Sequence, residues 1–318
     1  MLFIILPHTH AMLWLEMKKI PTSRYDILIA SHYGMCFGVK QAIEATEHLL
    51  TSKPATILGQ LAHNPLVKSR LDQQGAYSGK LESTAAPTSE VVITAHGASN
   101  KDRHRWHQAG YRVTDTTCPL VRVAHAKLAR LVAVGFQPVI IGKEGHVEVR
   151  GLQGDFPNAK VILHPRDVDR IPHAKKIGLI AQTTQPIDHV HSLVGEVRRQ
   201  RPEVEVVYMD TVCYPTKERQ TALHDLCRKA DLVLAIGGKN SNNTAQLART
   251  ARRLGCDAHH IEHPSDIKEE WLEGAKSIGL TAGTSTLDES LDAVLEHLKS
   301  IASNQAHPLK ITPAASPH

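Results

Sequence analysis

Three cysteines in this sequence share one local pattern, in which a β-rich run ends near the cysteine and a helical pattern begins after it. They are Cys36 in GMCFGVKQAIEA, Cys118 in DTTCPLVRVAHA and Cys213 in TVCYPTKERQTA. A thiol at a helix start feels the positive end of the helix, which lowers its pKa and favours the thiolate that binds metal. Three such thiolates from three parts of the chain can hold one metal centre.

The spacing of these cysteines distinguishes between kinds of metal centre. They lie 82 and 95 residues apart, and the sequence has no C-x-x-C pair. This disfavours zinc fingers, zinc ribbons and thioredoxin-like redox motifs. Isolated cysteines favour an iron-sulfur cluster assembled by the tertiary structure, with one iron left without a protein ligand. The alternative is that each is a small buried hydrophobe, which is our interpretation of Cys227 and Cys256.

Seven apolar runs, each ending in small or polar residues, predict strands buried in parallel α/β sheets. They span 25–34, 90–99, 137–146, 175–185, 204–213, 231–243 and 276–286. Helical periodicity follows the first thiol over 36–50 and the second over 120–131. Because each interval between the thiols is one small α/β unit, we expect three related units of two to four strands.

This pattern predicts an α/β fold in which three small units with parallel-rich sheets surround a central site. The predicted units span 25–118, 119–209 and 210–300. Residues 1–24 form an extension, and the Met17-Lys18-Lys19 sequence favours a start of translation at Met17. Residues 301–318, rich in Pro, Ser and Ala, are expected to form a flexible tail.

Polar residues collect where the predicted strands end, which is where ligands bind in open parallel sheets. We expect one polar pocket there, formed by His96, His146, Glu148, Thr183, Thr184, Ser241, Asn242, Asn243 and Ser285. Neutral donors at helix starts suit a phosphate or a diphosphate, and His63, His96 and His146 add protonatable donors. The alternative is ordinary helix capping, because Ser, Thr and Asn are favoured caps in any protein.

Glu148 is the carboxylate of this set that most closely follows a strand end. Beside an open iron and a bound anion it would stay protonated and act as an acid. A salt-bridged surface glutamate is the alternative interpretation.

The composition is that of a folded protein acting on a small molecule. Of 318 residues, 42% are hydrophobic and 22% are charged, so we do not expect extensive disorder. The net charge of +5 comes without a basic block interleaved with aromatics, so nucleic acid is not an expected partner. The apolar start is too short to span a membrane. Five cysteines without a secretory signature favour a reducing cytoplasm.

The ordered set of motifs resembles the 4-hydroxy-3-methylbut-2-enyl diphosphate reductases, the LytB family. The resemblance runs from about Tyr25 to Leu298 and depends on the order of the motifs more than on any single one. The motifs are GMCFGV, HN at 63–64, AHG at 95–97, DTTCPLV, GHVEV, QTT, VCYPTKERQ, KNSNN and TAGTST.

The resemblance implies an enzyme of the last step of non-mevalonate isoprenoid biosynthesis. An oxygen-sensitive 4Fe-4S cluster on Cys36, Cys118 and Cys213 would reduce an allylic alcohol diphosphate to isopentenyl and dimethylallyl diphosphates. Two electrons and two protons enter and water leaves, with the substrate hydroxyl on the open iron. A ferredoxin or flavodoxin is the implied electron donor, since no G-x-G-x-x-G follows a strand.

The resemblance also assigns roles to the polar residues. Glu148 would deliver the proton that lets the hydroxyl leave, Thr183 would hold that end of the substrate, and His146 would lie near the proton path. Substrate binding would fall to His63, His96, His146, Thr184, Ser241, Asn242, Asn243 and Ser285, mainly through the diphosphate.

Three positions depart from the common family pattern. Phe37 replaces a small residue beside a ligand, Val147 stands where proline is usual, and Asn242 stands where serine is frequent. They indicate a divergent branch. A reductase or dehydratase acting on another small anion, and a noncatalytic iron-sulfur sensor, therefore stay open as alternatives.

Overall fold

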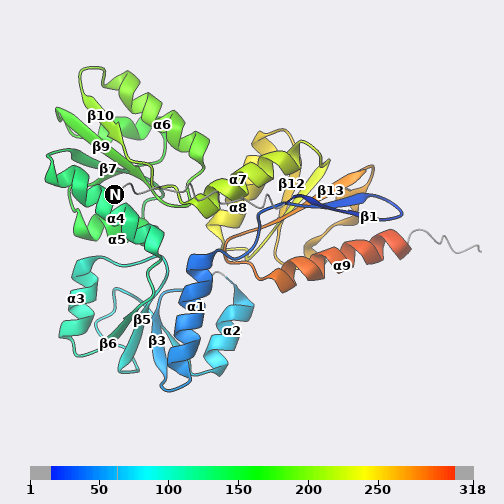
Figure 1. The fold of residues 1–318 in the computed structure, drawn as a ribbon, viewed down its shortest axis with the longest axis horizontal. Coiled ribbons are helices and arrows are strands. Elements are labelled where there is room, and N and C mark those ends of the chain that lie inside the picture. Colours follow the sequence, from blue (N-terminus) through cyan, green and yellow to red (C-terminus); the bar gives the residue numbers. More distant parts are fainter. Residues whose placement is uncertain (1–15, 63, 305–318) are drawn as a thin grey trace, which may run out of the picture.

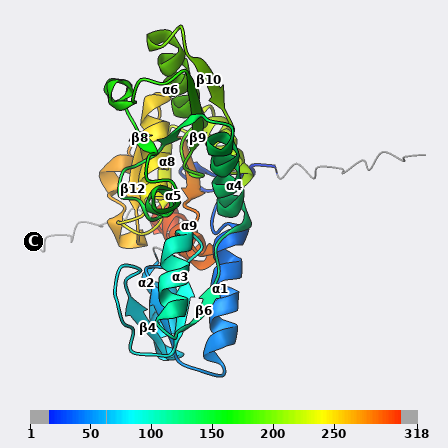
Figure 2. The same cartoon turned by 90° about the vertical axis from the view of Figure 1, so that its left-hand side faces the viewer.

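The computed structural model describes residues 16–62 and 64–304, which form three α/β units seen as three lobes around a common junction (Figure 1). Each unit is built on one parallel or parallel-rich sheet with helices on both faces. Figure 2 shows the same lobes from the side. The predicted fold class is confirmed.

The first sheet has the strand order β4 (Ala76–Gly79), β3 (Ala55–Leu58), β5 (Glu90–Ile93) and β6 (Arg112–Asp115), all parallel. Helices α1 (Phe37–Leu50) and α2 (Pro65–Gln73) share one hydrophobic cluster with it, and α3 (Asn100–Gln108) packs in another. Trp106 of α3 is fully buried and donates from its indole to the Leu81 carbonyl at 3.1 Å.

The second sheet repeats this order with β8 (Lys160–Ile162), β7 (Gln137–Ile141), β9 (Lys176–Ala181) and β10 (Glu205–Tyr208). Helices α4 (Pro119–Ala133) and α5 (Val147–Asp155) contribute to one cluster. Helix α6 (Ile187–Gln200) and the 3-10 helix η1 (Pro165–Arg170) contribute to the other.

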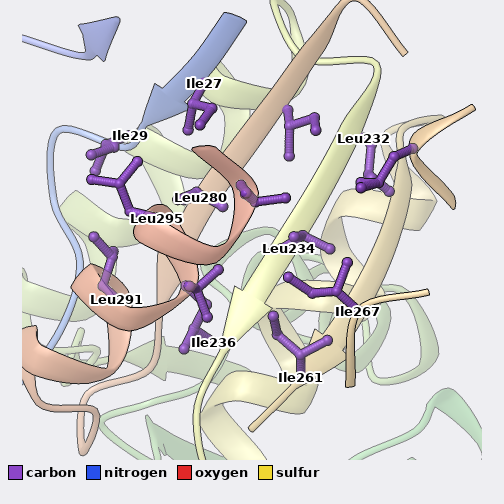
Figure 3. Packing of buried hydrophobic residues seen from close by; sticks show 14 of the residues in the cluster. Ile27, Ile29, Leu232, Leu234, Ile236, Ile261, Ile267, Leu280, Leu291 and Leu295 are labelled. Atoms are coloured by element: carbon purple, nitrogen blue, oxygen red, sulfur yellow. The ribbon is translucent and has the colours of Figure 1, made fainter. Parts of the chain in front are cut away.

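The third sheet has the order β12 (Asp257–Ile261), β11 (Leu232–Ile236), β13 (Ser277–Ala282) and β2 (Asp26–Ile29), with β1 (Lys18–Pro21) antiparallel at the edge. Helices α7 (Tyr214–Cys227) and α8 (Asn242–Arg253) pack on one face. Helix α9 (Asp288–Asn304) and the 3-10 helices η2 (Pro264–Asp266) and η3 (Glu269–Leu272) belong to the other side, where Leu291 and Leu295 meet Ile29 and Leu280 (Figure 3).

The three sheets therefore have equivalent strands in equivalent places, although the third one takes its last parallel strand from the start of the chain. One strand of each sheet occupies the same place: β6 pairs with β5, β10 with β9 and β2 with β13. The strands β2, β6 and β10 each lead directly toward one of the three cysteines. The repetition of the strand order accounts for the repeated strand, thiol and helix pattern in the sequence.

The predicted unit boundaries remain a prediction, but two details bear on the ends of the chain. Strand β1 lies within the predicted extension, and α9 continues to Asn304 because Leu298, Ile301 and Ala302 are buried against the third sheet's core. Residues 1–15, which precede the predicted start at Met17, lie outside the described residues. So do residues 305–318 of the predicted tail. Within the described ranges, no helix has both the length and the apolar character needed to cross a membrane.

Candidate functional site

The three cysteines occupy the same structural position in each unit. Cys36, Cys118 and Cys213 are the N-cap residues of α1, α4 and α7, and none of their side chains makes a capping hydrogen bond. Each cysteine N–H donates to a carbonyl two residues beyond the end of the neighbouring strand. The three acceptors are Thr284 at 3.2 Å, Ala95 at 3.1 Å and Thr183 at 3.0 Å, respectively.

The closeness of two of these corners depends on a glycine. A Cβ built on Gly38, the second residue of α1, would lie 2.5 Å from Sγ of Cys118. Real Cβ atoms do not approach another atom so closely, so a side chain here would displace the thiol. Gly38 thus allows Cys118 to pack directly against the helix that Cys36 begins.

The thiols also influence one another electrostatically. Burial raises the pKa of Cys118, and it raises the pKa of Cys213 to about 11, with negative charge on Cys36 and Glu148 adding to both shifts. The sequence-based expectation of lowered pKa values is therefore wrong for these two thiols in the metal-free protein. Burial outweighs the opposing influence of the first backbone N–H groups of α4 and α7 and of the Thr216 hydroxyl, 3.1 Å from the Cys213 sulfur. A bound metal would have to displace these protons.

A stacked aromatic pair lies beside two of the thiols. The rings of Phe37 and Tyr214 stack with centroids 5.8 Å apart and planes 9° from parallel, and each residue directly follows a cysteine. Tyr214 is 54% exposed, and negative charge on all three cysteines contributes to its raised pKa, after burial and Glu218. Phe37, an unusual residue at this position, thus links two of the corners through its ring.

Glu148 is held in a buried pocket at the start of α5. The residue is only 1% exposed. Both carboxyl oxygens accept hydrogen bonds from Thr183: Oε1 from its N–H at 2.7 Å and Oε2 from its hydroxyl at 2.8 Å. Burial raises the pKa of Glu148 to about 7, although the two Thr183 hydrogen bonds oppose the shift. The alternative of a salt-bridged surface glutamate does not describe this residue.

His146 lies next to this carboxyl group as the N-cap of α5. Its Nδ1 accepts from the Glu148 N–H at 3.3 Å, so the ring proton is on Nε2 in the neutral form. The rings of His146 and His96 meet edge to face with centroids 5.6 Å apart. The structure therefore brings these two predicted residues together from the second and first units.

His96, Thr184 and Ser285 are equivalent residues of the three units. Each is the third residue beyond β5, β9 or β13. Each lies in a turn closed by the next N–H, with bonds from Gly97 to Thr94, Gln185 to Gln182 and Thr286 to Gly283 of 2.9–3.0 Å. Thr184 accepts from Nε2 of Gln182 at 3.0 Å, and the Ser285 carbonyl accepts from Asn64 Nδ2 at 3.3 Å.

The loop before α8 supplies a second set of predicted residues. Ser241 is buried and caps the helix by accepting from the Thr244 N–H at 3.3 Å, as the capping alternative requires. Asn243 differs, because its Nδ2 is buried without a hydrogen-bond partner among the described residues. A Cβ on Gly283 would lie 3.5 Å from that nitrogen, which places Asn243 beside the Ser285 loop.

Two predicted residues cannot be placed in this way. His63 lies outside the described residues, and only the backbone of Asn242, as the first residue of α8, is described. A cavity of about 640 Å³ adjoins this region between the first and third units, lined by Asn64, Lys68, Gly238, Lys239 and Asn240 among others. The single polar pocket predicted from the sequence stays a prediction.

The residues around the thiols suit an iron-sulfur centre. Within residues 16–62 and 64–304, no three His, Cys, Asp or Glu side chains are arranged to hold a single metal ion. A cluster makes a different demand, because each of its thiolates binds a separate iron. Three equivalent corner thiols meet that demand: Gly38 lets Cys118 pack against the helix of Cys36, and negative charge on Cys36 acts on both other thiols. The buried cation Arg219 provides positive charge that acts on Cys36 and Cys213.

Sequence reasoning missed both Gly38 and Arg219. The first could have been found as a glycine just after a corner thiol at a helix start, where a close approach of another chain segment requires it. The second lies six residues after Cys213, within a motif that was noted without assigning this residue a role. Fold and site together define a three-unit α/β protein with a thiol centre and a buried acid at the junction.

Comparison with known proteins agrees with this class. Residues 27–299 match the family described as LytB protein. A 4-hydroxy-3-methylbut-2-enyl diphosphate reductase from Geobacter sp. (strain M21) is 34% identical over 278 residues, covering 87% of this chain and 98% of the relative. The chain belongs to the LytB family, whose members are iron-sulfur dependent.

Solved structures give the same result. The E-1-hydroxy-2-methyl-but-2-enyl-4-diphosphate reductase from Plasmodium falciparum superimposes with a TM-score of 0.79 at 26% identity, covering 89% of this chain and 88% of that one. A second structure is described as (E)-4-hydroxy-3-methyl-but-2-enyl diphosphate reductase, the terminal enzyme of the non-mevalonate pathway. It gives a TM-score of 0.63 at 31% identity, with coverage of 86% and 99%. The resemblance stated from the motifs is confirmed.

Proposed function

We propose that this protein reduces 4-hydroxy-3-methylbut-2-enyl diphosphate to isopentenyl and dimethylallyl diphosphates, the last step of the non-mevalonate pathway. It would use one 4Fe-4S cluster held by Cys36, Cys118 and Cys213. The observation that carries the proposal is the buried Glu148, which has a pKa of about 7 and lies within electrostatic range of two of the thiols. A noncatalytic sensor has no need of such an acid.

A cluster held by Cys36, Cys118 and Cys213 would pass on the two electrons of the donor protein one at a time and would supply a Lewis-acidic iron for the substrate hydroxyl. The protein supplies the proton. Glu148 holds it near neutral pH. In this structure the Thr183 hydroxyl donates to Oε2 at 2.8 Å; when the carboxyl group is protonated this hydrogen bond reverses, and the hydroxyl can accept that proton while passing its own toward the substrate. Proton transfer at this point makes water the leaving group, since a bare hydroxide leaves poorly.

The diphosphate end of the substrate is bound mainly by neutral donors and histidines. Asn243 Nδ2 is a buried donor without an acceptor among the described residues, which is expected of a group that binds an anion. Helix α8 begins at Asn242, so its N-terminus adds the favourable end of a helix dipole. His63, His96, Ser241 and Ser285 complete the proposed set, with Thr184 and Asn242 beside them.

Electrons arrive from a small electron-transfer protein such as a ferredoxin or a flavodoxin. The half-exposed Tyr214, stacked on Phe37, offers a short path between the three thiols and the surface. The chain is expected to work in the reducing cytoplasm, which protects both the thiols and the cluster.

The test is anaerobic. The protein is purified or reconstituted, its iron and sulfide are counted, and oxidation of a reduced viologen dye is followed on adding 4-hydroxy-3-methylbut-2-enyl diphosphate. About four irons per chain, as a 4Fe-4S cluster requires, with substrate-dependent dye oxidation, would support the proposal. A cluster without turnover would indicate another substrate or a sensor. Absence of a cluster would refute the assignment of the three thiols.

A further inference from the structure

Helix α7 contains a buried cation whose charge is not neutralised by a carboxylate in the described residues. Arg219 is 6% exposed and takes part in none of the ion pairs formed within 16–62 and 64–304. Nη1 donates to the Pro215 carbonyl at 2.8 Å and Nη2 to the Gly34 carbonyl at 2.6 Å. Nε is buried and has no hydrogen-bond partner among the described residues.

Such an arrangement is costly in the metal-free protein. Removing a charged group from water costs several kcal/mol, and neutral carbonyls recover only part of that cost. Burial lowers the pKa of Arg219, while negative charge on Cys36, then on Cys213 and Glu218, favours its protonated form. Two of the three groups that favour the charged guanidinium are therefore corner thiols.

The two carbonyl acceptors show what Arg219 connects. Gly34 stands two residues before Cys36, at the end of the loop from β2, and Pro215 stands two residues after Cys213, in the first turn of α7. One guanidinium thus joins two thiol corners that belong to different units. A lysine has a single ammonium group at this point and cannot reproduce the planar pair of donors.

We propose that Arg219 is a positioning residue for the iron-sulfur cluster, acting as its fixed counter-charge and tying the Cys36 and Cys213 corners together. This inference rests on the proposed cluster. Because reduction adds a negative charge to the cluster, a nearby buried cation stabilises the reduced state more than the oxidised one. Arg219 therefore raises the reduction potential and slows the loss of iron.

The test compares wild type with R219M and R219K, all reconstituted anaerobically. In R219M the reduction equilibrium of the cluster should shift at least tenfold toward the oxidised form, which is about 59 mV for a one-electron couple. R219K keeps the charge and should stay near the wild-type potential, while both variants lose iron faster to a chelator. The control is R228M, since Arg228 follows the same helix with a side chain that is 73% exposed.

Thermal unfolding of the apo and loaded proteins separates this role from a structural one. The ties to Gly34 and Pro215 are lost in both forms, but the counter-charge acts only when the cluster is bound, so R219M should lower the unfolding temperature of the loaded protein more than that of the apo protein. If R219M holds no cluster, the proposal requires a cooperatively unfolding apo R219M together with a wild-type potential in R219K.

Two results would overturn the inference. One is an unchanged potential in R219M, or a fall in R219K as large as that in R219M. The other is an apo R219M that is destabilised as much as the loaded protein, which would mean a merely structural arginine. A wild type that binds no cluster would instead refute the proposed function, so the two failures are distinguishable.

Discussion

Thr183 donates a hydrogen bond to each carboxyl oxygen of Glu148, from the Thr183 N–H to Oε1 and from the Thr183 hydroxyl to Oε2. Glu148 lies in the first turn of α5 and Thr183 in the loop beyond β9, so these two hydrogen bonds depend on the fold of the second unit. The same Thr183 accepts the N–H of Cys213 at its carbonyl. One residue thus fixes the distance between the acid and a thiol corner.

Replacing the acid tests its role most directly. Glu148→Gln keeps the size and can keep both contacts to Thr183, but it has no proton to deliver at neutral pH. We expect turnover to fall about 100-fold or more, as is typical of a lost general acid, with the visible spectrum of the cluster unchanged. Turnover equal to that of wild type would remove Glu148 from the mechanism.

The raised pKa of Glu148 also predicts a pH-dependent stability. In the native state the group keeps its proton up to a pKa of about 7, whereas the unfolded chain releases it near the ordinary value of 4.5. The native state then binds the extra proton, so the free energy of unfolding falls as pH rises from 4.5 to 7. At 1.36 kcal/mol per pKa unit, the decline is roughly 3 kcal/mol.

Glu148→Gln should lack that decline. Denaturant unfolding of the apo wild type and apo variant, measured in parallel from pH 4.5 to 8, isolates the contribution because all other groups are shared. The stability of the variant relative to wild type should rise with pH and level off above 7. A constant difference across this range would contradict the raised pKa.

The cysteines divide into two groups with different expected behaviour. Cys36→Ser, Cys118→Ser and Cys213→Ser should each lose most of the bound iron, since each thiolate binds its own iron. Cys227→Ser should keep the full iron content. Cys227 lies in the hydrophobic cluster of the third unit, and burial raises its pKa to about 12. Iron loss in that variant would overturn the ligand assignment.

Gly38 offers a test of how closely the thiols must approach. Gly38→Ala places a methyl group 2.5 Å from the Cys118 sulfur, so we expect reduced iron content and faster release of iron to a chelator. The matched control is Gly195→Ala in α6, where no atom lies within 4 Å of the new Cβ. That change should stabilise the protein by about 0.5–1 kcal/mol through helix propensity alone.

Asn243 and Ser241 should separate substrate binding from stability. Asn243→Ala removes a buried donor without an internal partner in the described structure, so KM should rise roughly 10-fold or more while the free energy of unfolding stays unchanged. Ser241→Ala removes the N-cap of α8 and should cost about 1 kcal/mol of stability as well. An unchanged KM in Asn243→Ala would remove that residue from the diphosphate site.

The sequence was most informative where a local pattern alone determines structure. The seven apolar runs correspond to β2, β5, β7, β9, β10, β11 and β13. Most of these are buried along their length, as parallel central strands are, so that their residues form continuous apolar stretches. The corner positions of Cys36, Cys118 and Cys213 followed from the same alternation of strand and helix.

Other features depend on contacts between distant segments and could not be predicted locally. The edge strands β4 (Ala76–Gly79) and β8 (Lys160–Ile162) have only four and three residues, with exposed positions, and are too short for a clear period. The pKa of Cys213 was predicted in the wrong direction, because its burial cannot be read from the local pattern. The partners of Arg219 are likewise 4 and 185 residues away.

The pairing of β2 with β13 also sets an order of events during synthesis. The Cys36 N–H finds its acceptor at Thr284, so the first thiol to leave the ribosome reaches its final position only after nearly the whole folded region has emerged. Chains are made from the N-terminus, and earlier units can fold first. The proposed cluster would therefore be inserted after translation of this region, because until then the three corner thiols are not assembled.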